Sequence, residues 1–205
     1  MLSGQPKLII VKLDKLHPTQ MTVGKAEVAL KRHEWTTLGK KARKQAVDNH
    51  WFPSIFGPEG RYYITDHHHF GLALLEEDVK TVSLIIQNDL SWLEPAKFWS
   101  VMDLRQWVHP YDSEGIRRDF EAVPKHLADL RDDPYRSLAG ESLRAGAFAK
   151  DDTPFSEFLW ADFFRGRISL DNLNQNFGNA LAKAIKLARI KEARYLPGWS
   201  GKKEA

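Results

Sequence analysis

The stretch Arg-Tyr-Tyr-Ile-Thr-Asp-His-His-His-Phe-Gly-Leu-Ala-Leu-Leu, residues 61–75, changes from a strand pattern to a helix pattern within two residues. Residues 62–65 are aromatic and β-branched, which is typical of a half-buried strand. From His68 onward the apolar residues recur at helical spacing. Asp66 is expected to cap this helix, because its carboxylate can accept N–H groups of the first turn. The pattern therefore predicts a strand that enters a helix at Asp66 and His67.

Three histidines begin this predicted helix, where exposed N–H groups and the positive end of the helix dipole favour an anion. Imidazole titrates near neutral pH and can act as an acid, a base or a phosphate ligand. Neighbouring residues on a helix point roughly 100° apart, so at most two of His67, His68 and His69 can face one ligand. The alternative interpretation is a helix cap followed by histidines that face solvent.

The patterns on either side of this stretch differ in kind. Before residue 90 we expect strands over 7–16 and 81–86, helices over 25–35 and 38–49 with Thr36 and Thr37 as caps, and a loop over 53–60. The strand of residues 62–65, the helix and the strand of residues 81–86 would form a βαβ-like unit. After residue 90 only helical periodicity is convincing, in five segments that span residues 95–107, 124–130, 134–144, 154–164 and 176–194. The sequence therefore predicts an α+β protein, with a small α/β module over residues 1–90 and an all-helical extension packed on it over residues 91–205.

Several classes of site are excluded by residues that the sequence lacks. It contains no cysteine, which excludes disulfides, thiol nucleophiles and cysteine-ligated zinc. His-Glu-x-x-His is absent, so a zinc enzyme would need distant ligands such as His17 or His109. Asp-x-Asp is also absent, which excludes the two-metal phosphoesterases whose motif begins Asp-His-His.

The chain of 205 residues carries a net charge of only +3, but its basic residues are unevenly placed. No stretch reaches the ~18 apolar residues of a membrane span and no signal peptide is visible, so we expect a cytoplasmic protein with no membrane partner. A basic face over residues 25–44 suits phosphates or nucleic acid, although a solvated helix face has the same composition. Its members are Lys25, Lys31, Arg32, Lys40, Lys41, Arg43 and Lys44.

Four segments in this order resemble the ParB/sulfiredoxin family, and more narrowly its ParB-like nuclease branch. They are Leu-Asp-Lys-Leu-His-Pro-Thr-Gln at 13–20, Val-Gly-Lys-Ala-Glu-Val at 23–28, Tyr-Tyr-Ile-Thr-Asp-His-His-His at 62–69 and the apolar strand at 79–86. The resemblance covers roughly the first 90 residues and implies a ParB/sulfiredoxin-like α/β module. The helical half, with Asp-Pro-Tyr-Arg-Ser at 133–137, resembles that branch's own extension.

The resemblance implies a nucleotide phosphate bound at the strand-to-helix turn, which some family members hydrolyse or transfer. Asp66, His68 and His69 match the motif's aspartate and two histidines. Two positions depart from the motif, because His67 replaces a glycine and Phe70 replaces an arginine that would clamp phosphate.

Together these patterns predict a nucleotide- or nucleic-acid-binding protein that, as an enzyme, would carry out phosphoryl transfer or phosphodiester hydrolysis. Mg²⁺ and ATP or CTP are the expected cofactors. The expected catalytic residues are His68 and His69 as acid, base or phosphate ligand, Asp66 to orient a histidine, and Glu27 as a weaker base. The expected phosphate-binding residues are His67, Lys25, Arg61, Thr19 and Gln20.

The alternative is a non-catalytic module of the same fold that holds DNA or a protein partner. The departures at His67 and Phe70 favour it, as does the absence of an acidic cluster that would hold a catalytic metal. In the helical half we expect Arg136 and Arg165 to pair with Asp132, Asp133 or Asp162 and to hold the helices together.

Overall fold

The computed structural model describes residues 7–201 and divides into two compact units. Of these residues, the first unit contains 7–23 and 28–131, and the second contains 24–27 and 132–201. The architecture is α+β with a helical C-terminal part, as predicted. Residues 91–131 group with the sheet, whereas the sequence predicted a domain boundary near residue 90. Among the described residues, no helix is both long and apolar enough to cross a bilayer.

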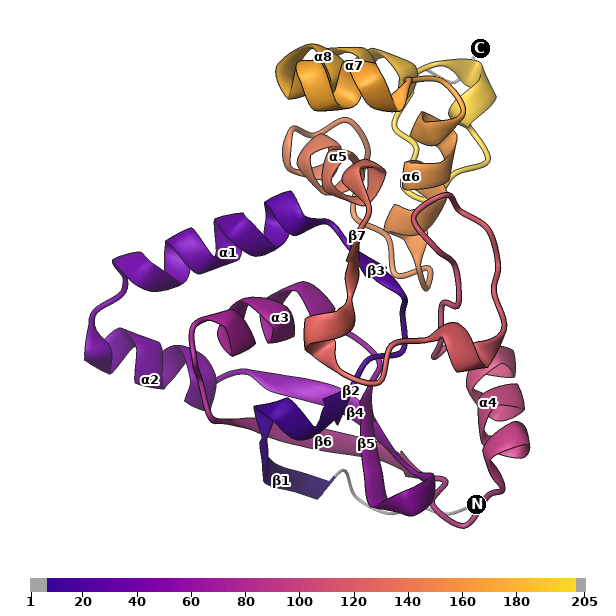
Figure 1. Cartoon of the computed structure of the whole chain (residues 1–205). Helices are drawn as coiled ribbons and strands as arrows, with labels where there is room; N and C mark the ends of the chain where they lie inside the picture. The colour runs from indigo at the N-terminus through magenta and orange to yellow at the C-terminus, as the bar shows by residue number, and fades with distance from the viewer. Residues whose placement is uncertain (1–6, 202–205) are drawn as a thin grey trace. The chain divides into compact units, whose positions relative to one another are not determined.

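A five-stranded mixed sheet forms the centre of the first unit (Figure 1). Its strands lie in the order β1 (Lys7–Lys12), β6 (Thr81–Asp89), β4 (Trp51–Gly57), β5 (Arg61–Ile64) and β2 (Leu16–His17). β1 is antiparallel to β6, β6 is parallel to β4, β4 is antiparallel to β5, and β5 is parallel to β2. The carboxyl ends of β2 and β5 therefore lie side by side at one edge of the sheet.

The prediction of a loop over residues 53–60 is wrong, because β4 occupies the middle of the sheet up to Gly57. Pro53 cannot donate a ladder hydrogen bond, but its carbonyl accepts one from Thr65 N over 2.9 Å. The register shifts between Ser54 and Ile55, and such an irregularity is where a sheet tolerates proline. Of the predicted loop, only Pro58–Gly60 lies outside β4, and it forms a 3-10 turn called η2.

The predicted βαβ-like unit is not a parallel one. β5 leads into α3 (His68–Glu76) and then β6, but β4 lies between the two strands and makes them antiparallel to each other. α3 packs on the sheet at Gly71, where an added Cβ would lie 3.3 Å from side-chain atoms of both Phe52 and Leu127. The missing side chain of Gly71 therefore allows the helix to approach the sheet closely.

Hydrophobic clusters cover both faces of the sheet. Alternate residues of β5 face opposite ways, so Ile64 belongs to one cluster and Tyr63 to the other. The Ile64 cluster includes side chains of α1 (Lys25–Thr37), α2 (Lys40–Asp48) and α3. The Tyr63 cluster includes Phe98 of α4 (Pro95–Leu104).

Two further local predictions are corrected in this unit. Thr36 and Thr37 do not cap α2, because they form the last two residues of α1 and their hydroxyls donate to carbonyls of that helix. Gly39 occupies the N-cap position of α2 instead. The predicted helix over residues 124–130 is only a 3-10 turn, η4 (Leu127–Asp129), preceded by another, η3 (Phe120–Ala122). Short strands β3 (Thr22–Val23) and β7 (Arg131–Asp132) were also not predicted.

The second unit is built from helices around an aromatic and alanine-rich core. α5 (Pro134–Arg144) and α6 (Ser156–Arg165) match the predicted segments closely, and Trp160 and Phe164 are fully buried in the core. The last predicted helix, residues 176–194, is shorter than expected. It is preceded by α7 (Leu170–Gln175) and consists of α8 (Phe177–Leu187) followed by the 3-10 turn η5 (Lys191–Ala193).

Candidate functional site

The loop that follows β2 is joined to the first turn of α3 by direct hydrogen bonds. Thr19 N donates to Nε2 of His68 over 3.1 Å, and Thr19 Oγ1 donates to the carbonyl oxygen of Ile64 over 2.8 Å. Both Thr19 and His68 are buried. Since Nε2 of His68 accepts a hydrogen bond, it carries no proton, and the neutral ring holds its proton on Nδ1. The parallel pairing of β2 with β5 brings these two segments together.

The turn itself is made by His67, which adopts a left-handed conformation with φ 65° and ψ 24°. This residue, not Asp66, occupies the N-cap position of α3, so the predicted cap is displaced by one residue. The carboxylate of Asp66 accepts instead from the adjacent His67 N over 2.6 Å. Glycine reaches left-handed φ values without strain, so the turn keeps the conformation that a glycine motif requires although histidine occupies it.

The His67 ring packs into an aromatic cluster with Phe70 of the same helix. The centroid of His50 lies 4.5 Å from that of His67 and 4.6 Å from that of Phe70. Burial lowers the pKa of His50 to about 4, helped by the nearby positive charge of His67 and Lys31. The two residues that depart from the sequence motif, His67 and Phe70, therefore contact the same neutral imidazole.

The three histidines differ in their access to solvent. His68 and His69 are buried, with 3% and 7% of their surface exposed, whereas His67 is half-buried and Asp66 is exposed. The solvent-facing side of the turn is therefore formed by Asp66 and His67, and His68 faces the loop that contains Thr19.

The side chain of Gln20, the next residue of that loop, is held by a hydrogen bond to the backbone nearby. Its Nε2 donates to the carbonyl oxygen of Thr22 over 2.7 Å, and the side chain is buried. The carbonyl oxygen of Thr19 accepts from His109 N over 2.7 Å. Thr19 and Gln20 are thus both held by internal hydrogen bonds, and their predicted contacts with phosphate stay a prediction.

Arg61 lies at the start of β5, at the opposite end of this strand from the turn. Its guanidinium pairs with Glu59 and lies near His17 and Tyr63. Burial lowers the pKa of His17 to about 4, and the positive charges of Arg61 and His126 act in the same direction. The structure therefore places Arg61 in a second cluster of titratable groups and does not bring it to Asp66.

Residues 9–166 match the sequence model of a family described as "Putative ParB-like nuclease". The chain belongs to this ParB-like nuclease family. The predicted membership is confirmed, and the match extends beyond the first 90 residues into the helical unit. The crystal structure of protein Atu1540 from Agrobacterium tumefaciens is 47% identical in sequence, covers 97% of this chain and 99% of that chain, and superimposes with a TM-score of 0.92. No curated protein matches the chain.

The ParB-like nuclease match includes Glu27 and Lys25, which belong to the helical unit. Glu27 contacts Arg136 over 3.6 Å, and Arg136 also pairs with Glu157. The backbone N of Lys25 donates to Asp132 Oδ1 over 2.8 Å. Arg136 therefore pairs with two glutamates, and the prediction that it pairs with aspartates is wrong. The roles predicted for Glu27 and Lys25 toward phosphate stay predictions.

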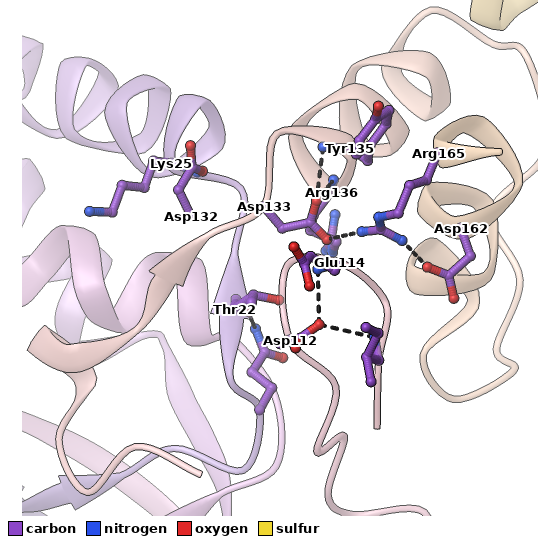
Figure 2. A network of polar contacts seen from close by, with 12 residues as sticks. Thr22, Lys25, Asp112, Glu114, Asp132, Asp133, Tyr135, Arg136, Asp162 and Arg165 are labelled. Atoms are coloured by element: carbon purple, nitrogen blue, oxygen red, sulfur yellow. Dashed lines mark hydrogen bonds and ion pairs between the residues drawn. The ribbon is translucent and has the colours of Figure 1, made fainter. Parts of the chain in front are cut away.

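Arg165, by contrast, pairs with the two aspartates expected for it (Figure 2). Its guanidinium donates to Asp133 Oδ2 over 2.6 Å and also contacts Asp162. The other oxygen of Asp133 accepts from Tyr135 N over 2.9 Å and Arg136 N over 3.3 Å, which caps α5. Burial raises the pKa of Asp133, and the charge of Arg165 opposes that rise. This network ties α5 to α6 and has a structural role.

A metal ion that is bound by side chains alone needs a cluster of side chains that can hold it. Residues 7–201 contain no group of three or more His, Cys, Asp or Glu side chains that could hold a metal ion. His109 stacks on Tyr111 with ring centroids 4.5 Å apart. The ring centroids of His17 and His126 are 6.0 Å apart. The residues present therefore do not fit a zinc centre built from His17 or His109.

The basic face over residues 25–44 is partly neutralised by neighbouring groups. Arg32 pairs with Glu76 and Glu77, and Lys44 pairs with Asp48 over 2.5 Å. Arg43 donates to the carbonyl oxygens of Trp35, Thr36 and Leu38 at the end of α1. Lys40 and Lys41 are exposed at the start of α2. The face offers fewer cations to a phosphate chain than its composition suggests.

Proposed function

We propose that the chain binds the phosphate of a nucleotide or of nucleic acid at the turn formed by residues 66–69. The left-handed conformation of His67 is the observation that carries this proposal. A phosphate needs close access to backbone N–H groups at the start of α3, and this conformation is the one that a glycine would adopt there. Family membership supports the same site, because the match covers the whole turn.

As an enzyme, the chain would transfer a phosphoryl group or hydrolyse a phosphodiester. His68 holds the Thr19 loop through Nε2, so we assign it a positioning role. His69 is then the acid or base, His67 contacts the phosphate, and Asp66 orients His67. Arg61, Thr19, Gln20 and Lys25 stay secondary candidates for phosphate binding, and Glu27 stays the weaker candidate base.

ATP or CTP is the proposed nucleotide. Mg²⁺ keeps several waters and needs only one or two carboxylates when phosphate oxygens complete its shell. Asp66 supplies one exposed carboxylate at the turn. A magnesium ion would therefore arrive with the nucleotide, in keeping with the lack of a group of three metal-binding side chains among residues 7–201.

A non-catalytic binding module is the second candidate function. Phe70 supports it, because an aromatic ring stands where the motif has a phosphate-clamping arginine, and this ring packs on His50 and Phe52. Such a module would hold DNA or a protein partner without turnover.

Binding of ATP, CTP, GTP and a short DNA duplex to the full chain, with and without Mg²⁺, tests the proposal. Saturable nucleotide binding that is lost in His67→Ala/His69→Ala supports the phosphate site, whereas His33→Ala, an exposed change, should bind normally. Nucleotide binding that is absent or indifferent to the double variant would overturn it. With binding established, product formation that stops with chelator indicates an enzyme, and salt-dependent association without products indicates the binding module.

A further inference from the structure

Helices α7 and α8 follow one another in the helical unit (Figure 1). A polar groove is lined by residues of both helices and lies beyond the last residue of the family match. Its volume is about 360 Å³. Buried Ile168 and Ala180 are its apolar members. The remaining lining consists of four carboxamides and one ammonium group, which belong to Asn172, Gln175, Asn176, Asn179 and Lys183. These polar residues are all exposed.

Asn176 lines this groove and lies between α7 and α8. With φ −150° and ψ 85°, Asn176 interrupts the helical path between α7 and α8. Its Oδ1 accepts from Asn179 N over 2.9 Å and caps α8. Lys183 Nζ donates to the carbonyl oxygen of Arg167 over 2.8 Å. An ammonium group has three donors, so this bond anchors Lys183 and leaves donors that can reach a ligand.

The charge around the groove exceeds that of the chain as a whole. Residues 167–194 contain six basic and two acidic residues, a net +4, while the whole chain carries +3. The rest of the chain is therefore slightly acidic. The basic residues are Arg167, Lys183, Lys186, Arg189, Lys191 and Arg194.

α8 presents its polar residues on one face. Asn179, Lys183 and Lys186 are exposed and follow one another at four- and three-residue spacing, which places them along one side of a helix. Ala180 and Ala184 are buried in the core of the unit. The exposed face thus begins with a carboxamide and continues with cations.

We propose that α8 and the carboxamide groove bind double-stranded DNA. Asn and Gln can form paired hydrogen bonds with base edges, and Lys and Arg neutralise phosphates. An α-helix fits the major groove of B-DNA but not that of an RNA duplex. No aromatic side chain lines the described groove, so it lacks the stacking platform on which single strands rely. This surface is separate in sequence from the turn at residues 66–69 and does not depend on its function.

Fluorescence anisotropy of labelled duplex DNA with the full chain tests the proposal over a series of salt concentrations. Lys183→Gln/Lys186→Gln should weaken binding roughly tenfold and lower the slope of log Kd against log salt by about two, because two phosphate contacts are lost. Gln175→Ala/Asn179→Ala should weaken binding without changing that slope. Lys12→Gln/Lys15→Gln removes two exposed lysines at the same spacing, outside every candidate site, and is the matched control that should bind like the wild type.

Equal binding by the wild type and Lys183→Gln/Lys186→Gln, with unchanged melting temperatures, would overturn the proposal. Binding lost only in a separate variant of the basic face over residues 25–44, Lys40→Gln/Lys41→Gln, would do the same and would assign DNA to that face. Competition by single-stranded DNA or duplex RNA as effective as that by duplex DNA would refute the assignment of the ligand class.

Discussion

Thr19 N donates a hydrogen bond to Nε2 of His68 across 49 residues of sequence, over 3.1 Å and out of contact with solvent. The bond joins the loop after β2 to the first turn of α3, at adjacent carboxyl ends of parallel strands. It also fixes the neutral tautomer of His68. His68 therefore has a structural role in joining these two segments.

His68→Ala should destabilise the protein, because it leaves the buried N–H of Thr19 without an acceptor and opens a cavity. An unsatisfied buried donor costs about 1–3 kcal/mol, and the cavity adds to that cost. Urea unfolding of the variant measures the loss. His33→Ala, at an exposed position of α1, should change stability by less than about 0.5 kcal/mol. Equal stability of the two variants would refute the structural role of His68.

His67 should tolerate replacement by glycine or asparagine and reject β-branched residues. Its φ of 65° costs a β-branched side chain roughly 1–2 kcal/mol, whereas glycine adopts it freely. His67→Gly loses the contact with His50 but relieves backbone strain, so we expect a net change near zero. Thermal unfolding should rank His67→Gly above His67→Val. The opposite order would show that the side-chain contacts of His67 outweigh its backbone conformation.

The sequence predicted the position of this turn but not its detailed geometry. A switch from strand to helix spacing is a local signal, and it located the entry to α3 within one residue. The cap was assigned to Asp66 because carboxylates favour that position, yet Asp66 bonds the adjacent N–H and His67 makes the turn. The family motif carries a glycine here, and that glycine was the available signal for a positive φ.

Contacts between residues far apart in the sequence explain what the sequence-based prediction missed. Pro53 and the glycines after it indicated a loop, but β4 is held by β6 and β5, whose partnership no local pattern reveals. Glu27 was predicted as the weaker base, and its contact with Arg136, 109 positions later and inside the helical unit, was not predicted. The pairing of Arg165 was predicted correctly, because Asp162 is one turn away on the same helix; the structure adds that Asp133 also caps α5.

Stability should fall as the pH decreases from about 6.5 toward 4. The folded-state pKa of His50 is about 4, below the ordinary value of 6.5, so the unfolded chain binds more protons in this range. His50 contributes on the order of 1 kcal/mol after allowance for its partial exposure, and His17 acts in the same direction. Urea unfolding at pH 7.5 and pH 5 measures the effect. His50→Phe should flatten the dependence, and His33→Ala should not.

Arg165→Met should destabilise the helical unit by about 3 kcal/mol, because it leaves the buried carboxylate of Asp133 without its cationic partner. Asp133→Asn in the same background should recover part of this loss, since the amide oxygen still caps α5 and carries no charge. Guanidinium unfolding of the two single variants and the double variant forms a thermodynamic cycle. Additive losses would show that the pair is not coupled.

Two glycines that both precede helices should respond in opposite ways to alanine. A Cβ on Gly24 would lie 2.7 Å from Ser137 N and 2.9 Å from Ser137 Cα, closer than real Cβ atoms approach backbone. Gly24→Ala must therefore displace the start of α1 from α5, and we expect a loss of about 1–3 kcal/mol in the free energy of unfolding.

Gly39 precedes α2 with φ −70° and has nothing within 4 Å of an added Cβ. Gly39→Ala should change stability by less than about 1 kcal/mol, because alanine is a poorer N-cap but restricts the unfolded chain. Unfolding midpoints that coincide for the two variants would show that the first turn of α1 does not need its contact with Ser137.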